Sequence, residues 1–420
     1  MLQQTAVPSI LPALIMLTAF ASGAQDRLDL NQLLKQALDR NPEILAAQKR
    51  YEAARQRPTQ VSSLPDPMIS PGFNSNGRPW PGALLGTEPT SNIGVMVSQE
   101  IPFPGKRKLA GDMAVIEAAA EFEQYQQAQL SVVSRVKQAY YKLAFAYSAT
   151  AVIDRNLALL AKFIQIAEAR YSAGKAEQQE IFKAQTQMSV LETRRVMMQR
   201  ERRSREAELN SLVNRPPGAP IDQPTDLKEV ALPAELKDLF RSAQENSPML
   251  RRDQKMIQRS EQAVNMARKE FLPDFTLNGG YYNMGRMPDM YMFRADFKVP
   301  LYFFRKQRPG VTEQSQLLAQ ARRTYEATNQ SLHYRIQDDY AMAEAAAKLI
   351  DIYRKTVIPQ AGLTLESSLA SYETGKADFL AVLMNSMAVI EYEMNYWEEI
   401  QNLHLALVRL EEMTGKRLIP

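Results

Sequence analysis

The amino-acid sequence predicts a mainly α-helical fold made of a duplicated unit, in which a pair of β-strands precedes a long helical hairpin. Three observations support this prediction. Two distant segments read alike, RYSAGKAEQQE at 170–180 and SYETGKADFLA at 371–381. Long runs poor in proline and glycine surround both segments, and short stretches of alternating polar and apolar residues precede those runs. An order of landmarks that recurs along a chain indicates a repeated supersecondary unit.

The duplication extends beyond the two similar segments. LKQALDRNPEI at 34–44 resembles FRSAQENSPML at 240–250. We therefore predict a first repeat over residues 25–220 and a second over residues 221–420. The matching positions of the two similar segments lie 201 residues apart and pair Tyr171 with Tyr372, Gly174 with Gly375, Lys175 with Lys376, and Ala176 with Ala377.

Each repeat is expected to contain two long helices joined by a tight turn. No proline occurs within residues 105–214, and apolar residues recur there at spacings of three and four, which is typical of amphipathic helices. Gly174 is expected to reverse the chain, because glycine adopts the left-handed conformation at low cost. We predict helical hairpins over about 105–214 and about 310–414, pointing the same way, with a kink or local break at Pro359.

Four segments show the alternation of β-strands. In DMYMFRADFKVP at 289–300, every second side chain is apolar, and the opposite face carries Arg294, Asp296 and Lys298. Strands of about ten residues suit a bilayer. Four strands leave open edges, which lipid does not tolerate, so a membrane β-barrel with this charged face in its lumen requires several chains. A soluble sheet on a core is the alternative. The strands are expected at about 66–76, 91–101, 273–283 and 290–300.

Composition indicates a folded protein. The chain is 45% hydrophobic and 23% charged, and its 51 basic and 47 acidic residues give a formal net charge of +4, which does not indicate nucleic-acid binding. The basic run at 199–208 is interleaved with acids and is interpreted as a solvated helix face. Residues 10–20 are apolar and small residues follow, so we expect a signal peptide over 1–24, without the usual basic start.

The sequence lacks the residue patterns of enzyme sites. It contains no cysteine, its two histidines, His333 and His404, lack the spacing of a zinc site, and no Walker A, GxSxG or GxGxxG pattern occurs. We therefore predict no enzyme activity, no cofactor and no metal site. One cluster of thioethers can bind Cu(I) or simply fill gaps in packing. Its members are Met284, Met287, Met290 and Met292.

This order of elements resembles the TolC-like outer-membrane efflux protein family across essentially the whole chain after the signal peptide. LPDPM at 64–68, QEIPFPGKRK at 99–108 and IPQA at 358–361 are most similar to the branch that serves heavy-metal resistance-nodulation-division pumps. The resemblance implies a homotrimer in the outer membrane of a Gram-negative bacterium, with a shared β-barrel and a periplasmic α-barrel tube. It also implies a passive exit duct that receives cargo, heavy-metal cations among the candidates, from an inner-membrane pump and a periplasmic adaptor.

The resemblance further implies functional positions at the two hairpin turns. Relatives narrow the tube near the second turn with a ring of aspartates, but Ala381 and Met384 stand at those positions here. Glu180 and Asp378 remain as candidates for an acidic constriction, with ordinary solvated helix-end charges as the alternative. In the family the turns contact the hairpin tips of the adaptor, and the matching residues are Tyr171, Gly174, Lys175, Tyr372, Gly375 and Lys376.

Two other functions remain open at the level of the sequence. A periplasmic adaptor or coiled-coil scaffold also carries long helices, but it would show one hairpin between β-rich halves instead of two hairpins that each follow a strand pair. A periplasmic metal-binding protein is disfavoured by the absence of cysteine and the presence of only two histidines. The sequence leaves the cargo open between metal cations, drugs and polypeptides.

Overall fold

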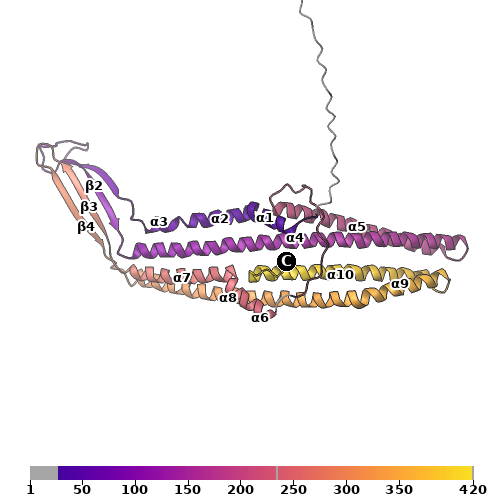
Figure 1. The fold of residues 1–420 in the computed structure, drawn as a ribbon. Coiled ribbons are helices and arrows are strands. Elements are labelled where there is room, and N and C mark those ends of the chain that lie inside the picture. Colours follow the sequence, from indigo (N-terminus) through magenta and orange to yellow (C-terminus); the bar gives the residue numbers. More distant parts are fainter. Residues whose placement is uncertain (1–26, 233–234, 419–420) are drawn as a thin grey trace, which may run out of the picture.

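The computed structural model describes residues 27–232 and 235–418, so the predicted signal peptide lies outside the described residues. The molecule is elongated, with a β-sheet at one end and the turns of two helical hairpins at the other (Figure 1). The helices carry most of the chain, and the mainly α-helical fold predicted from the sequence is confirmed.

The helices and strands follow the predicted order twice. The elements of the first repeat are α1 (Leu30–Arg40), α2 (Pro42–Ala54), α3 (Arg57–Ser62), β1 (Met68–Asn74), β2 (Asn92–Ile101), α4 (Lys106–Ser172) and α5 (Gln178–Leu212). The elements of the second repeat are α6 (Leu236–Asn246), α7 (Pro248–Lys269), β3 (Asp274–Asn283), β4 (Met290–Lys298), α8 (Gln307–Ile352), the π-helical segment η1 (Tyr353–Val357), α9 (Ile358–Glu373) and α10 (Phe379–Thr414).

The short helices of both repeats meet at the same kind of step. Asn41 caps α2, since its side-chain oxygen accepts a hydrogen bond from the backbone N–H of Glu43 at 2.9 Å. Pro42 then occupies the first turn, where a missing N–H costs nothing. In the second repeat Ser247 and Pro248 hold the equivalent positions before α7. The Asn-Pro and Ser-Pro steps therefore end one helix and start the next.

The two hairpins differ in one respect. The first arm of the first hairpin, α4, is one continuous helix of 67 residues. The equivalent arm of the second hairpin is divided, because the π-helical segment of five residues at Tyr353–Val357 separates α8 from α9. Pro359 lies in the first turn of α9. Proline lacks an N–H and clashes with the carbonyl group one turn earlier, and a wider π-turn relieves that clash. The predicted local break is present.

The four strands form one antiparallel sheet in the order β1-β2-β3-β4. The two strand pairs join through β2 and β3, which align Ile93 with Asn283 and Ile101 with Phe275. The central contact of the sheet is therefore a contact between the repeats. Strands β1 and β4 are the edges, and their outer hydrogen-bonding groups have no partner strand among the described residues.

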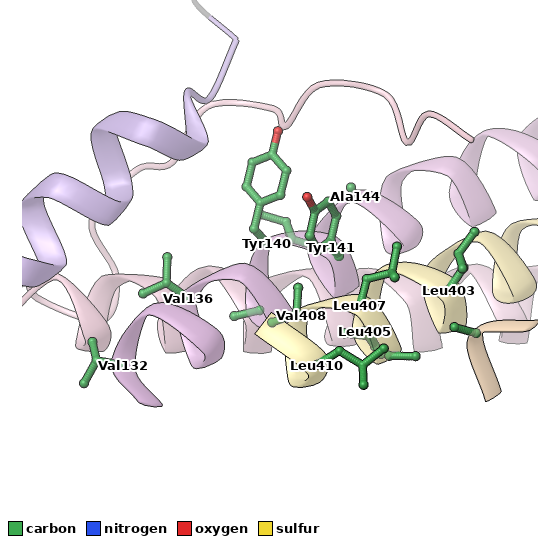
Figure 2. Packing of buried hydrophobic residues seen from close by; sticks show 14 of the residues in the cluster. Val132, Val136, Tyr140, Tyr141, Ala144, Leu403, Leu405, Leu407, Val408 and Leu410 are labelled. Carbon is green, nitrogen blue, oxygen red and sulfur yellow. The ribbon is translucent and has the colours of Figure 1, made fainter. Parts of the chain in front are cut away.

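The largest core lies midway along the molecule, where α4 and α10 pack against each other, with α1 in contact with α4 and α6 in contact with α10. Figure 2 shows side chains of α4, among them Val136 and Tyr141, close to Leu407 and Val408 of α10. Burial of one such aliphatic side chain stabilises the fold by roughly 1.5–3 kcal/mol. Lys137 of α4 also forms a buried ion pair with a carboxylate of α10, that of Glu411. This core holds the two hairpins together at their midpoint.

Candidate functional site

The two hairpin turns are built alike. Gly174 and Gly375 both have positive φ, +67° and +76°, in the left-handed region that favours glycine. In the first turn the N–H of Lys175 donates to the carbonyl of Arg170 at 2.8 Å, which is the six-residue bond of a Schellman motif. The second turn has the same bond, from Lys376 to the residue five positions earlier, also at 2.8 Å. Both long helices thus end with the same backbone geometry.

Arg170 links the end of the first hairpin to the end of the second. Its guanidinium donates hydrogen bonds to the carbonyl oxygens of Tyr372 and Glu373 in the second hairpin, the latter at 3.2 Å. It also donates to the carbonyl of Lys175 in its own turn at 3.3 Å. The guanidinium carbon lies 4.4 Å from the centroid of the Tyr372 ring, within the range of a cation–π contact.

A second polar interaction joins the two hairpins through the Tyr372 side chain. The hydroxyl of Tyr372 donates to the Glu180 carboxylate at 2.7 Å. Burial, followed by this hydrogen bond, raises the pKa of Tyr372 well above its usual range, so the hydroxyl keeps its proton and remains a donor. The Phe379 ring lies 5.4 Å away, and apolar side chains of both hairpins surround the pair. Arg170, Glu180 and Tyr372 therefore hold the two hairpins to each other next to their turns, and we call these three residues the lock.

Two of the predicted constriction residues, one of them the Glu180 of this contact, lie together. Glu180 and Asp378 both line a surface hollow with a volume of about 490 Å³. Glu177 adds a third carboxylate, and Lys175 and Lys183 add two ammonium groups. The hollow is a mixed-charge depression between the starts of α5 and α10. In the described ranges, no group of three histidine, cysteine, aspartate or glutamate side chains is arranged to hold a metal ion.

The remaining predicted tip residues differ in exposure. Tyr171 is 45% exposed, whereas its repeat equivalent Tyr372 is 2% exposed. The Tyr372 ring is enclosed between the hairpins, so at this position only the backbone of the turn is open to an adaptor, and the assignment of both tyrosine positions as adaptor contacts stays a prediction. Lys175 and Lys376 are exposed at the turns. The other two constriction positions, Ala381 and Met384, are also exposed but do not line the hollow.

The contact of Arg170 and Glu180 with Tyr372 does not follow from the similarity between the two repeats. Its signal lies in the positions where the two copies differ, because Arg170 matches Ser371 and Glu180 matches Ala381 at the offset of 201 residues. The first copy supplies the polar groups and the second copy supplies the enclosed tyrosine. A comparison of the copies for differences, in addition to similarities, would have singled out both residues.

The sheet at the opposite end has one apolar and one polar face. On the apolar face, Val95 and Val97 of β2 and Tyr291 and Phe293 of β4 are exposed, Phe293 at 78%. Polar side chains join three strands on the other face. Asn278 accepts a hydrogen bond from the Ser98 hydroxyl at 2.6 Å and donates to Asp296 at 2.8 Å.

The predicted lumen residues lie on this polar face. Arg294 pairs with Asp296 at 3.0 Å, and Lys298 is aligned with Asp274 on the neighbouring strand. Tyr282 covers part of the same face. A Cβ at Gly94 would lie 2.5 Å from its ring, so glycine is required there for the ring to lie across the strands.

Both histidines stack on aromatic rings within the fold. His404 is buried, stacks on Tyr141 at 4.2 Å and donates from Nε2 to the Lys228 carbonyl at 2.8 Å. Burial lowers the pKa of His404 and keeps the ring neutral. His333 stacks on Phe240 at 4.7 Å.

Across the part of the chain that the structure describes, no helix is long and apolar enough to cross a membrane.

The sequence also matches a described family. The profile of outer membrane efflux proteins matches residues 33–215 and 239–416, one segment in each predicted repeat. The chain belongs to the outer membrane efflux protein family. A comparison with curated proteins gives no significant match.

Solved structures show the same fold. The outer-membrane channel OprN has a TM-score of 0.79 at 16% identity, and the match covers 98% of both chains. VceC from Vibrio cholerae has a TM-score of 0.78 at 19% identity, with 92% of this chain and 96% of VceC covered. CusC has a TM-score of 0.77 at 16% identity, with 92% of this chain and 91% of CusC covered.

Family membership identifies the protein as a component of an outer-membrane efflux channel, and the family is a class of channels and not of enzymes. The adaptor or scaffold alternative is not supported, because the described chain has two hairpins and a single four-stranded sheet.

Proposed function

We propose that the chain forms a homotrimeric, passive exit duct that crosses the outer membrane and extends into the periplasm. The observation that carries this proposal is the open sheet at one end of the molecule. Its edge strands β1 and β4 are unpaired among the described residues, and its exposed apolar face suits lipid. Pairing of β4 of one copy with β1 of the next would close a barrel and turn the polar face with Arg294 and Asp296 inward.

We further propose that the hairpin turns at the opposite end receive a periplasmic adaptor, which connects the duct to an inner-membrane resistance-nodulation-division pump. Tyr171, Lys175 and Lys376 are exposed there and offer one aromatic and two cationic contacts. The backbone of Tyr372 and Gly375 contributes the second turn. Energy for transport comes from the pump, since no nucleotide-binding motif accompanies the duct.

Heavy-metal cations are the cargo that we propose, on the basis of the sequence motifs at 64–68, 99–108 and 358–361. The carboxylates of Glu180 and Asp378 support passage of cations at the periplasmic end. The duct needs no metal site of its own for this role, because its cargo moves through water.

The first experiment is a measurement of size and shape. The protein would be extracted from outer-membrane fractions in mild detergent and examined by light scattering and negative-stain electron microscopy. We expect a trimer with a tube of more than about 100 Å, the length of its longest helix at 1.5 Å per residue. A monomer that is soluble without detergent would contradict the proposal.

A further inference from the structure

The segment from the end of β4 to the first turn of α8 joins exposed apolar side chains to basic ones. Leu301, Tyr302 and Phe304 are largely exposed, Tyr302 at 78%. Arg305, Lys306 and Arg308 follow within four residues of Phe304 and are exposed as well. The backbone between them is held in tight turns, with the Arg305 and Lys306 N–H groups both donating to the Tyr302 carbonyl at 3.0 Å. We name this group of six residues, Leu301, Tyr302, Phe304, Arg305, Lys306 and Arg308, the collar.

Neighbouring connections extend the collar with the same two kinds of side chain. The ring centroids of Phe303 and Phe304 lie 4.1 Å apart in a tilted arrangement, and Phe303 lies 6.5 Å from Phe271 in the connection from α7 to β3. The Arg308 guanidinium lies 4.4 Å from the Phe304 ring. In the connection from β2 to α4, Phe103 lies 6.0 Å from the Lys269 ammonium group. Aromatic and cationic groups thus lie close together in these connections, which join the sheet to the long helices (Figure 1).

The charge of the collar is not balanced by the fold. Residues 298–308 contain four basic residues and no acidic one. Within the described ranges, Arg305, Lys306 and Arg308 form no ion pair, whereas nearby Lys106 is buried and pairs with Asp274 at 2.9 Å. Among the described residues, the buried lysine at this junction has an ion-pair partner and the three exposed cations do not. The collar therefore presents a net positive surface.

The collar continues the apolar face of the sheet. Phe297 lies on the same face as Phe293 by strand alternation, and the exposed Val299 and Leu301 follow directly after the end of β4. The apolar surface therefore ends in aromatic side chains and then in cations, on the side of the long helices. Aromatic side chains favour the boundary between hydrocarbon and water, and cations near that boundary attract anionic head groups.

We propose that the collar binds the head groups of anionic phospholipids in the periplasmic leaflet of the outer membrane. The inference rests on the proposed function, because it requires the sheet to lie in the bilayer. The phosphate diester would be held by Arg305, Lys306 and Arg308 while Leu301 and Tyr302 enter the acyl region. The contact fixes the depth at which the helical tube leaves the membrane.

The test compares lipid retention by three purified full-length proteins, the wild type, a collar variant and a charge-matched control. The collar variant carries Arg305→Gln, Lys306→Gln and Arg308→Gln. The control carries Lys162→Gln, Arg194→Gln and Arg203→Gln, which remove the same charge from exposed positions on the first hairpin. Each protein is titrated with phosphatidylglycerol or phosphatidylcholine in nonionic detergent, and bound lipid is counted by native mass spectrometry.

We expect the wild type and the control to retain phosphatidylglycerol over phosphatidylcholine, with a preference that weakens as salt is raised. The collar variant should lose about tenfold or more of that preference, as expected for three cations near an anionic surface. All three proteins should remain trimeric in detergent without lipid.

Other results would overturn the inference. An unchanged lipid preference in the collar variant would show that other residues select the lipid. Loss of the trimer in the collar variant without lipid would show that the collar is a subunit contact. If every protein, the wild type included, inserts into no bilayer and is monomeric, the proposed function fails and the inference fails with it. A wild-type trimer that inserts but has no lipid preference overturns the inference alone.

Discussion

Tyr372 illustrates how one residue gains a role from its surroundings. It occupies the same place in the second copy as Tyr171 in the first, but its ring is enclosed and its hydroxyl reaches Glu180 at 2.7 Å. Arg170 holds its carbonyl and lies against its ring. The same residue type in the same turn is therefore a contact within the chain in one copy and an exposed side chain in the other.

Replacement of Tyr372 by phenylalanine should loosen the hairpin tips. The change removes the bond to Glu180 but keeps the ring, so a loss of about 1 kcal/mol in the local free energy of opening is expected. Hydrogen–deuterium exchange should speed up at residues 174–181 and 371–379. Tyr171→Phe is the control and should leave exchange unchanged. Equal exchange in both variants and the wild type would mean that the hydroxyl bond does not hold the tips.

His404 should make the fold less stable in acid. Burial lowers its pKa in the folded protein below that of the unfolded chain, about 6.5. The stability that this neutral, buried ring contributes is therefore fully present above the unfolded pKa and is lost as pH falls below it. Thermal unfolding of wild type and His404→Gln would be compared at about pH 8 and pH 5. Between these two pH values, the melting temperature of the wild type should fall further than that of His404→Gln. An equal fall in both proteins would contradict this assignment.

The break in the second hairpin is a property of an element. Pro359 has Ala158 as its equivalent at the offset of 201, and Ala158 lies exposed in the uninterrupted helix α4. The π-helical segment Tyr353–Val357 is therefore assigned to the proline rather than to the repeat. The two equivalent arms thus differ in the π-helical segment because one has proline where the other has alanine.

Matched substitutions test that assignment. Ala158→Pro should destabilise α4 by about 3 kcal/mol, because it removes an internal hydrogen bond and introduces a clash in an α-helix that has no π-turn there. Pro359→Ala should be neutral or stabilising, since the existing segment already accommodates proline. Chemical denaturation of both variants would measure the difference. A cost for Pro359→Ala as large as that for Ala158→Pro would show that neighbouring contacts impose the π-turn.

At the scale of the whole molecule, the carboxylates proposed to line a constriction of the duct lie at the end opposite the sheet. Glu180 and Asp378 share one hollow with Lys175 and Lys183. Three copies around an axis would bring together three such hollows near the turns. Carboxylates that line a constriction favour cations over anions.

Neutralisation of both carboxylates should therefore reduce cation selectivity. The double variant Glu180→Gln and Asp378→Asn would be compared with wild type in planar bilayers, and the ratio of cation to anion permeability should fall by roughly several-fold. Glu373→Gln, at an exposed turn position outside the hollow, is the control. Unchanged single-channel selectivity in the double variant would remove both residues from the constriction.

The sequence by itself determined the duplicated architecture. Helical periodicity, the paired glycine turns and strand alternation are local signals, and local backbone preferences produce them without tertiary help. The strands at 68–74 and 92–101, the continuous helix α4 and the break before Pro359 all follow from such signals. The turn residues Gly174 and Gly375 follow for the same reason.

Only the tertiary structure decided which side chains meet. The bonds from Arg170 to the second turn, the enclosure of Tyr372 and the junction of the repeats through β2 and β3 join residues that are far apart in sequence. Periodicity carries no information on such pairs, because it reports the face on which a residue lies and not the partner across that face. The lock at the tips arises from packing between elements, which the folded chain alone specifies.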